Sequence, residues 1–312
     1  MKKRAVFIFL ISISFFPYNS FAQYINIRQW QANYAFTNPA FTGISNSPRI
    51  CADYEQIFPK FNPGTRIYEL HYDQRISPKT GFIGVSYMYD VAGPVQTRQS
   101  AGLHYAYSFK LNEKMTLRAG ASASFVHADI DTSKVISATK EDFPTNMNGG
   151  FFGFGTVLTY KNIFAGLSAF NYSGDFRTKK ANGNNTFTGN FSLQTGGFFP
   201  VNNSNPKSTV IAPHIMIIGV PRNILVVPGV NVNKGIFTGG LSYRLYTYGD
   251  GLAFLAGVSK GWVKAGYTCD FLFTDARSAF SGSHQLSLTI YPGRISEENK
   301  TGLPYYFRKM GF

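Results

Sequence analysis

From about residue 48 to residue 291 the chain alternates between apolar and polar residues with a period of two. The segment GLHYAYSFKL (102–111) is a clear case, because its apolar residues fall at every second position and Gly, His, Ala, Ser and Lys residues fall between them. Those apolar residues are Leu103, Tyr105, Tyr107 and Phe109. Successive side chains of a β-strand point to opposite faces, so the pattern predicts strands with one apolar and one polar face.

We count about 14 candidate strands, most of them about ten residues or longer. They lie near 48–57, 64–76, 82–90, 97–110, 115–129, 150–160, 163–172, 188–200, 209–219, 223–231, 235–247, 251–260, 262–273 and 282–291. A tilted strand needs about this length to cross a bilayer. Lipid offers the backbone no hydrogen bonds, so a sheet within it must close. The pattern predicts an all-β fold, a closed antiparallel transmembrane β-barrel of about 14 strands, with the apolar face outward; a soluble β-sandwich is the alternative.

The connections between these segments differ in length on alternate sides. One set consists of short turns such as LNEK, KN, VNKG and KG, and the other contains loops such as 130–149 and 173–187. Short periplasmic turns and long outer loops are typical of outer-membrane barrels. Two connections depart from the pattern, because VPRN is short for an outer loop and VNNSNPKS is long for an inner turn. The asymmetry favours the barrel and places both termini on the periplasmic side.

The N-terminus carries an export signal. Residues 1–22 combine three basic residues, an apolar run of about a dozen residues and small residues before Ala22, as in a secretory signal peptide. No later apolar run is long enough for a transmembrane helix. The net charge of +14 is scattered, which favours outer-membrane lipid and lipopolysaccharide as partners and not nucleic acid. Cys51 and Cys269 are expected to be strand residues, with a single bridge between them left open.

Four regions follow from these observations: a signal peptide (1–22), an irregular N-terminal segment (23–47), the barrel (48–292) and a periplasmic tail (293–312). The irregular segment contains NYAFTNPAFTG, which we expect to fold into the periplasmic mouth or lumen as a plug or periplasmic contact. A disordered leader is the alternative. Pro39 and Gly43 would form a turn there, and Asn38 would hydrogen-bond locally. Tyrosines near strand ends are expected to form interfacial girdles; these are Tyr87, Tyr89, Tyr105, Tyr107, Tyr243, Tyr246 and Tyr248.

Nothing in the sequence predicts catalysis, a cofactor or a metal. The five histidines show no metal-ligand spacing, and no nucleophile elbow or phosphate-binding loop is present. A hydrolase within the barrel would need a Ser–His pair, but Ser283 and His284 are strand neighbours and point to opposite faces. Asp270 lies near a turn and is expected to be solvated. The glycine-rich segments GNFSLQTGG and GGFFGFGT are expected to reduce bulk in the barrel wall.

Several motifs, taken together in their order, resemble one family. NPAFTG at 38–43 resembles the signature that follows the signal peptide in the PorP/SprF family of type IX secretion outer-membrane proteins. The stretch 81–111 is similar to that family's glycine-alternating strand, Asp-x-x-Gly turn and Tyr-Ala-Tyr strand. GLSYRL, VKAGYTCDF and SGSHQLSL resemble its closing segments, with Cys269 in place of the usual Tyr and Gln285 in place of Glu.

The resemblance implies a non-enzymatic outer-membrane barrel of a Bacteroidota-type bacterium. Such a protein supports secretion or surface attachment of a partner, such as a gliding adhesin, by binding its C-terminal domain. It also implies a possible link to a periplasmic peptidoglycan-binding lipoprotein. A passive porin or hydrophobic-solute channel is the alternative. The family-motif residues, candidates for structural or partner contacts, are Asn38, Pro39, Ala40, Phe41, Gly43, Asp90, Gly93, Gly266, Tyr267, Asp270, Gly282, Ser283 and His284. The loop candidates for partner contact are Lys134, Lys140, Arg177, Lys179 and Lys180.

Overall fold

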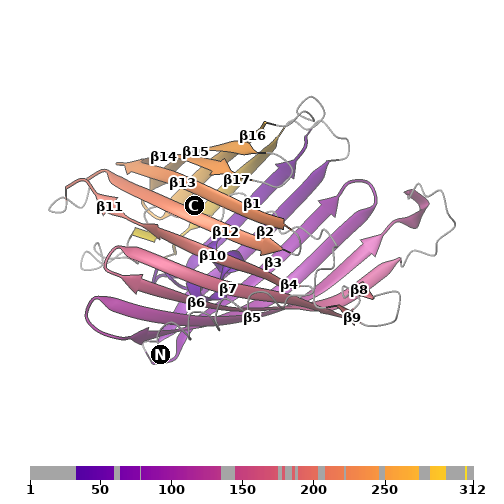
Figure 1. The fold of residues 1–312 in the computed structure, drawn as a ribbon, viewed down its shortest axis with the longest axis horizontal. Helices are drawn as coiled ribbons and strands as arrows, with labels where there is room; N and C mark the ends of the chain where they lie inside the picture. Colours follow the sequence, from indigo (N-terminus) through magenta and orange to yellow (C-terminus); the bar gives the residue numbers. More distant parts are fainter. Residues whose placement is uncertain are drawn as a thin grey trace, which may run out of the picture.

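The structure is a computed structural model in which a closed antiparallel β-barrel of fourteen strands dominates (Figure 1). The residues that it describes are 33–59, 64–77, 79–134, 145–174, 178–179, 185–186, 189–202, 208–220, 223–245, 250–273, 282–292 and 306–307. The barrel strands are β1 (Arg49–Ile57), β2 (Thr65–Ser77), β3 (Gly81–Ala92), β4 (Gln96–Lys110), β5 (Met115–Ile130), β6 (Asn146–Tyr160), β7 (Ile163–Gly174), β10 (Gly189–Gly197), β12 (Val210–Val220), β13 (Asn223–Lys234), β14 (Phe237–Arg244), β15 (Gly251–Lys260), β16 (Val263–Leu272) and β17 (Ser283–Ile290).

Small elements accompany the barrel. β8 (Thr178–Lys179) pairs with β9 (Asn185–Thr186) in a separate hairpin, and β11 (Phe199–Pro200) pairs with β12. α2 (Tyr34–Thr37) and η2 (Pro39–Phe41) precede β1, and η3 (Thr132–Lys134) follows β5. The described part of the chain contains no helix that is long and apolar enough to span a membrane.

The sheet closes on itself without a free edge. Each barrel strand pairs antiparallel with its neighbour along the chain, and β10 pairs directly with β12. The first and last strands also pair, in a register that runs from Ile50↔Ile290 to Ile57↔Ser283. Because the sheet closes, the backbone N–H and C=O groups of every wall strand can pair with a neighbouring strand, and lipid offers them no other partner. The predicted barrel is confirmed; two predicted strands differ in detail, since 188–200 divides into β10 and β11, and β14 ends at Arg244.

The two faces of each strand are sorted as the alternation predicts. In β4, Leu103 and Tyr105 are 63% and 46% exposed, whereas His104 and Ala106 are buried. In β17, Leu286 and Leu288 are exposed on the outer surface and Ser287 and Thr289 are buried. Apolar side chains therefore face the lipid and polar ones face the lumen.

The predicted tyrosine belts fall partly within the described residues. Tyr87, Tyr105 and Tyr243 are exposed on the outer surface, whereas Tyr246 and Tyr248 lie outside the described residues. Tyr87 and Tyr243 lie on the parts of their strands away from the short turns, and Tyr105 lies nearer to them.

The short turns lie at one end of the barrel, at the left of Figure 1, together with the start of β1 and the end of β17. Gly235 and Gly261 are the first residues of two of these turns, with φ values of 64° and 63°, which glycine adopts without steric cost. By the rule for outer-membrane barrels, this end faces the periplasm. The connection from β10 to β12 is the long exception at this end.

Neither Cys51 nor Cys269 is part of a disulfide. Cys51 faces the lumen, where its Sγ lies 3.3 Å from Oγ1 of Thr289, and Cys269 lies on the opposite, lipid-facing side of β16. The bridge that the sequence left open is therefore not formed.

Candidate functional site: the lumenal plug and the periplasmic mouth

Residues 33–47, here called the plug, lie against the inner wall of the barrel near its periplasmic end. α2 and η2 form one compact turn of chain in which nearly every residue is buried. Asn38 joins the two helices in an extended conformation, and Pro39 begins η2, where its missing N–H is not needed. Gly43 ends this turn with a φ of 65°. The plug is therefore built of ordinary turn chemistry and is too short to hold its shape without the wall.

Asn38 connects the plug to three strands. Its side-chain oxygen accepts a hydrogen bond from the backbone N–H of Ala40 at 2.9 Å, which caps η2. Its side-chain nitrogen lies 3.2 Å from each of three acceptors, which are the carbonyl oxygens of Thr156 and Leu167 and Oε1 of Gln194. These acceptors belong to β6, β7 and β10. One buried amide thus makes both the local bond expected from the sequence and long-range bonds to the wall.

The carbonyl oxygen of Thr37 is the second anchor. It accepts hydrogen bonds from Oγ of Ser168 at 2.6 Å, Oγ of Ser192 at 3.0 Å and Nε2 of Gln194 at 3.3 Å. These donors stand on the inner faces of β7 and β10. Small polar residues of the lumenal face therefore satisfy a backbone acceptor at the end of α2, which a buried helix end requires.

Arg118 of β5 is the third anchor. Its Nε donates to the carbonyl oxygen of Ala40 at 2.8 Å and its Nη2 donates to that of Thr42. Its Nη1 donates to Oγ of Ser108 at 2.8 Å, and its guanidinium lies 4.2 Å from the ring centroid of Phe82. The planar guanidinium of arginine suits this contact, because its donors reach two carbonyl oxygens of the plug and the Ser108 hydroxyl of the wall at the same time.

Glycines in the wall make room for the plug. A Cβ at Gly120 would lie 2.4 Å from the backbone nitrogen of Ala40, and one at Gly155 would lie 2.0 Å from Oδ1 of Asn38. Both distances are shorter than any real Cβ contact, so the plug fits only against a wall without side chains there. The glycines of GGFFGFGT were expected to reduce bulk, and Gly155 does so where the plug lies.

Aromatic rings join the plug to the C-terminal residues 306–307. The ring of Phe307 lies 5.0 Å from that of Tyr34, 5.6 Å from Phe41 and 5.0 Å from Phe164. It also lies 5.1 Å from Phe198, whose ring stacks on that of Tyr306. These two residues belong to the segment 293–312, which was predicted to lie in the periplasm without a contact to the plug. Both ends of the described chain therefore meet at the periplasmic mouth.

Burial in this cluster changes the chemistry of one plug residue. Tyr34 is 2% exposed. Loss of solvation, with a smaller contribution from Tyr291, raises the pKa of Tyr34 well above its ordinary value. The phenol therefore stays neutral at any physiological pH and acts as a packing residue.

A charged network lies beside the plug on β1 and β2. Nη2 of Arg49 lies 2.6 Å from Oδ2 of Asp73, and Nε2 of His71 lies 3.0 Å from the same oxygen. The ring of His71 lies 5.1 Å from that of His104, whose Nε2 lies 2.8 Å from Oγ of Ser86. All of these side chains face the lumen. The Asp73 carboxylate compensates the buried guanidinium of Arg49, as a buried charge requires.

The predicted residues Asp90 and Asp270 lie further toward the outer end of the lumen. Oδ2 of Asp90 accepts from Nη2 of Arg98 at 2.7 Å. Asp270 is 2% exposed, lies 3.1 Å from Nη1 of Arg244 and accepts from Oγ of Ser283 at 3.1 Å. The expectation that Asp270 is solvated was wrong, because its side chain points inward from β16 and pairs with Arg244 on the lumenal face.

The other motif residues take separate positions. Ser283 faces the lumen and His284 the lipid side, as the alternation predicts, and Nδ1 of His284 lies 2.6 Å from the hydroxyl of Tyr267. Gly266 faces the lumen on β16. Gly93 and Gly282 have φ values of 62° and 81° where the chain enters or leaves outer connections. These residues do not meet the plug, so the motif set does not converge on one site.

Two of the loop candidates, Lys134 and Lys179, lie at the outer end of the barrel. Lys134 forms an exposed ion pair of 2.7 Å with Asp131. Lys179 belongs to β8. Lys140, Arg177 and Lys180 lie outside the described residues.

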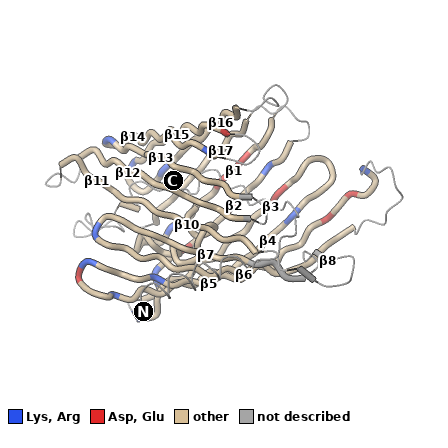
Figure 2. The backbone as a smooth tube through the Cα atoms, viewed as in Figure 1, with Lys and Arg blue, Asp and Glu red and all other residues tan. Residues whose placement is uncertain are grey.

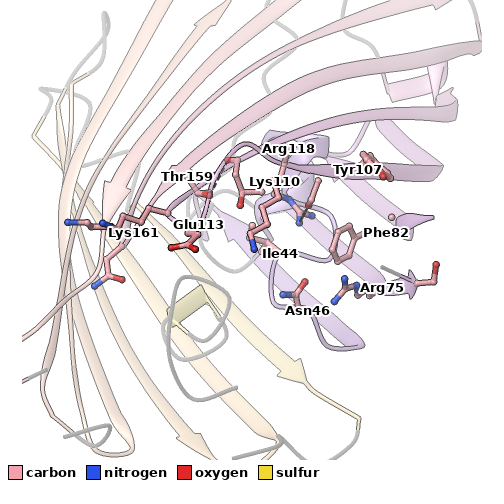
Figure 3. A pocket seen from close by; sticks show the side chains of 16 residues that line it. Ile44, Asn46, Arg75, Phe82, Tyr107, Lys110, Glu113, Arg118, Thr159 and Lys161 are labelled. Atoms are coloured by element: carbon pink, nitrogen blue, oxygen red, sulfur yellow. Dashed lines mark hydrogen bonds between the residues drawn. The ribbon is translucent and has the colours of Figure 1, made fainter. Parts of the chain in front are cut away.

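A cavity of about 770 Å³ opens at the periplasmic mouth, next to the plug (Figure 3). Its charged side chains are Arg75, Lys110, Lys114, Arg118, Lys161 and the single acid Glu113. In Figure 3, Arg118 lies against the ring of Phe82, and Lys110 points toward Ile44 of the plug. Figure 2 shows Lys and Arg at the turns of this end of the barrel.

The sequence indicated a plug segment but did not indicate the wall and C-terminal residues that contact it. The missed residues are Arg118, Ser168, Ser192, Gln194 and Phe307. Ser and Gln on a strand's polar face signal only a solvated lumen. A small-residue position such as Gly120 or Gly155 on the inward face was the one available signal that something lies close to the wall.

The arrangement can hold a segment of chain or a partner. In the residues that the structure describes, no group of three or more His, Cys, Asp or Glu side chains could hold a metal. The Ser86–His104 pair is a nucleophile–base distance apart, but Nδ1 of His104 has no hydrogen-bond partner among the described residues.

Comparisons with known proteins agree with this architecture. A family model described as type IX secretion system membrane protein PorP/SprF matches residues 19–290. No curated protein sequence matches the chain. Among solved structures, the outer membrane protein Omp33 of Acinetobacter baumannii is similar, with a TM-score of 0.50, 8% identity and coverage of 79% of this chain and 98% of that one. The toluene transporter TodX of P. putida has a TM-score of 0.49 and 9% identity over 84% of this chain and 95% of that one. The likeness to Omp33 shows an outer-membrane barrel fold and nothing finer.

Proposed function

Because the chain belongs to the PorP/SprF family of type IX secretion system membrane proteins, we propose that it supports secretion or surface attachment of a partner protein by binding that partner's C-terminal domain. Its location is the bacterial outer membrane, since family and barrel fold agree. A gliding adhesin is the kind of partner that the family implies.

The plug carries the proposal. A passive channel needs an open lumen, whereas here residues 33–47 and the ring of Phe307 occupy the periplasmic end. Three separate anchors hold the plug, namely Asn38, the carbonyl of Thr37 and the Arg118 side chain. A barrel whose periplasmic end is closed by so many contacts suits a protein that binds a partner at its outer end. The outer loops 130–149 and 173–187 are the proposed contacts for that partner.

The test is recovery of the partner from the outer membrane. The tagged chain is purified from detergent-solubilised outer membranes, and co-purifying proteins are identified by mass spectrometry. We expect one large surface protein, and we expect its C-terminal domain, produced alone, to bind the purified chain. An unrelated barrel carrying the same tag serves as the control. Removing 173–187 should abolish binding. Failure of the isolated domain to bind would refute the proposal.

A passive porin or hydrophobic-solute channel makes the opposite prediction. In planar bilayers the intact chain should then conduct steadily, and no surface protein should be retained. We expect the intact chain to be mostly closed and a chain lacking 24–47 to conduct. Equal conductance of the two would argue against a plug and in favour of the porin.

We propose further that the protein is not an enzyme. On the lumenal face, Oγ of Ser86 lies 2.8 Å from Nε2 of His104, a distance that a nucleophile and its general base could have. A general base of this kind needs a third group to orient it. A hydrolytic activity that disappears in Ser86→Ala would contradict this part of the proposal. A periplasmic peptidoglycan-binding lipoprotein of the secretion machinery is a second proposed partner, on the side of the termini.

A further inference from the structure

The cavity at the periplasmic mouth has an excess of positive charge. Five basic side chains and one acid line it. Within the described part of the chain, none of Arg75, Lys110, Lys114 and Lys161 forms an ion pair. Clustered like charges repel each other in the absence of a counter-charge, so the arrangement costs stability unless something outside the barrel compensates it.

Arg75 also lies over the Phe82 ring, at 5.8 Å, but Arg118 differs from the other four basic side chains because its guanidinium donates to carbonyl oxygens of the plug. Arg118 lies at the floor of the cavity, with Ile44 of the plug beside it. The other four basic side chains stand at the rim, where β2, β4, β5 and β6 reach their turns. The turns are held together, since the backbone N–H of Lys161 donates to the carbonyl oxygen of Lys114 at 3.0 Å. The rim therefore presents several cations on turns whose backbones are joined.

The size and make-up of the cavity favour an extended acidic ligand. A volume of about 770 Å³ lies within the range of roughly 300–1,000 Å³ that ligand pockets occupy. Three of the four rim cations are lysines, which act as hydrated point charges and do not impose the bidentate geometry of an arginine fork. Spread over several turns, they fit successive carboxylates along a chain better than one compact anion. The cavity lies on the lumenal side of the wall, away from lipid head groups.

We infer that the periplasmic mouth is a docking site for an acidic peptide segment of a periplasmic partner, with its carboxylates at the lysine rim. Glu113 lies among the cations and limits the net charge of the site. The plug forms one wall, so the site exists only while the plug is in place. The inference deepens the proposed function by naming how the periplasmic side of the barrel binds the secretion machinery.

The test uses the full mature chain in a nonionic detergent and fluorescein-labelled hexaglutamate as the probe. Binding is followed by fluorescence anisotropy at about 0.05 M and about 0.15 M salt, because exposed charges are screened within about 8 Å at the higher value. The pocket variant is Lys110→Glu, Lys114→Glu and Lys161→Glu together. The control variant is Lys79→Glu, Lys234→Glu and Lys260→Glu, which changes the net charge by the same amount with exposed lysines at the same end of the barrel but outside the cavity.

We expect the pocket variant to weaken binding by about tenfold or more and the control variant by less than about threefold. A Lys→Gln version of the pocket variant should behave in the same direction, and it keeps the test valid if charge reversal disturbs folding. Equal weakening by both variants, or no binding by the unaltered chain, would overturn the inference. Displacement of the probe by phosphatidylglycerol nanodiscs but not by unlabelled hexaglutamate would overturn it in favour of a lipid. The experiment contains no secreted partner, so its failure and the failure of surface-protein binding are distinguishable.

Discussion

The plug should loosen when Asn38 is replaced by alanine. The substitution removes the bond accepted from the backbone N–H of Ala40 and the bonds donated by Nδ2 to Gln194 and to the carbonyl oxygens of Thr156 and Leu167. Two hydrogens serve those three acceptors, so about three hydrogen bonds disappear in total. Asn38 is fully buried, so water does not take the place of the lost hydrogen bonds while the plug is docked.

The bond from Ala40 lies within the plug, so only the two bonds to the wall contribute to docking. Each has a net value of about 1 kcal/mol, so the plug loses about 2 kcal/mol of docking free energy. Since 1.36 kcal/mol corresponds to about a tenfold change, the ratio of undocked to docked plug rises roughly 30-fold.

Single-channel recording of the purified chain in planar bilayers measures this ratio as the frequency of openings. We expect a rise of roughly 30-fold in Asn38→Ala, following the free-energy estimate. Asn112→Ala is the matched control. Asn112 also accepts a local backbone N–H bond, from Lys114 at 2.9 Å, but it lies exposed in the turn between β4 and β5.

An opening frequency in Asn38→Ala that equals that of the unaltered chain and of Asn112→Ala would refute the reasoning. The same result in a chain that circular dichroism shows to be folded would mean that the plug does not control the lumen. A rise in both variants would instead show that loss of any capping asparagine destabilises the barrel as a whole.

Three further outcomes follow from the same contacts. Phe307→Ala removes a buried ring, and such a truncation costs about 3–5 kcal/mol. Tryptic cleavage of the C-terminal segment should therefore become faster, whereas the lipid-facing control Phe109→Ala should leave its rate unchanged. Arg118→Lys keeps the charge but loses the fork to the plug carbonyls, so openings should become more frequent, and unchanged openings would show that charge alone suffices. Without reductant, unfolding should expose two thiols to alkylation, at Cys51 and Cys269, and a mass consistent with a disulfide would contradict the structure.

Much of the fold was predictable because it rests on local alternation. A strand's two faces can be read from every second residue, and the requirement for a closed sheet follows from lipid chemistry. The strand from 102 to 111 and the Ser283–His284 pair therefore fell on the predicted faces. The prediction that Asp270 is solvated was wrong, because its partner Arg244 is distant in sequence and becomes its neighbour only after β14, β15 and β16 align.

The sequence alone determined the closed barrel, its inside and outside, and the end at which the chain begins, because each of these depends on residue type at short spacing. Only the tertiary structure decided which residues hold the plug in the lumen. Residues near positions 40, 118, 155, 194 and 307 meet there because the sheet curves round and closes, and the alternation of any one strand carries no information about a neighbour across the lumen.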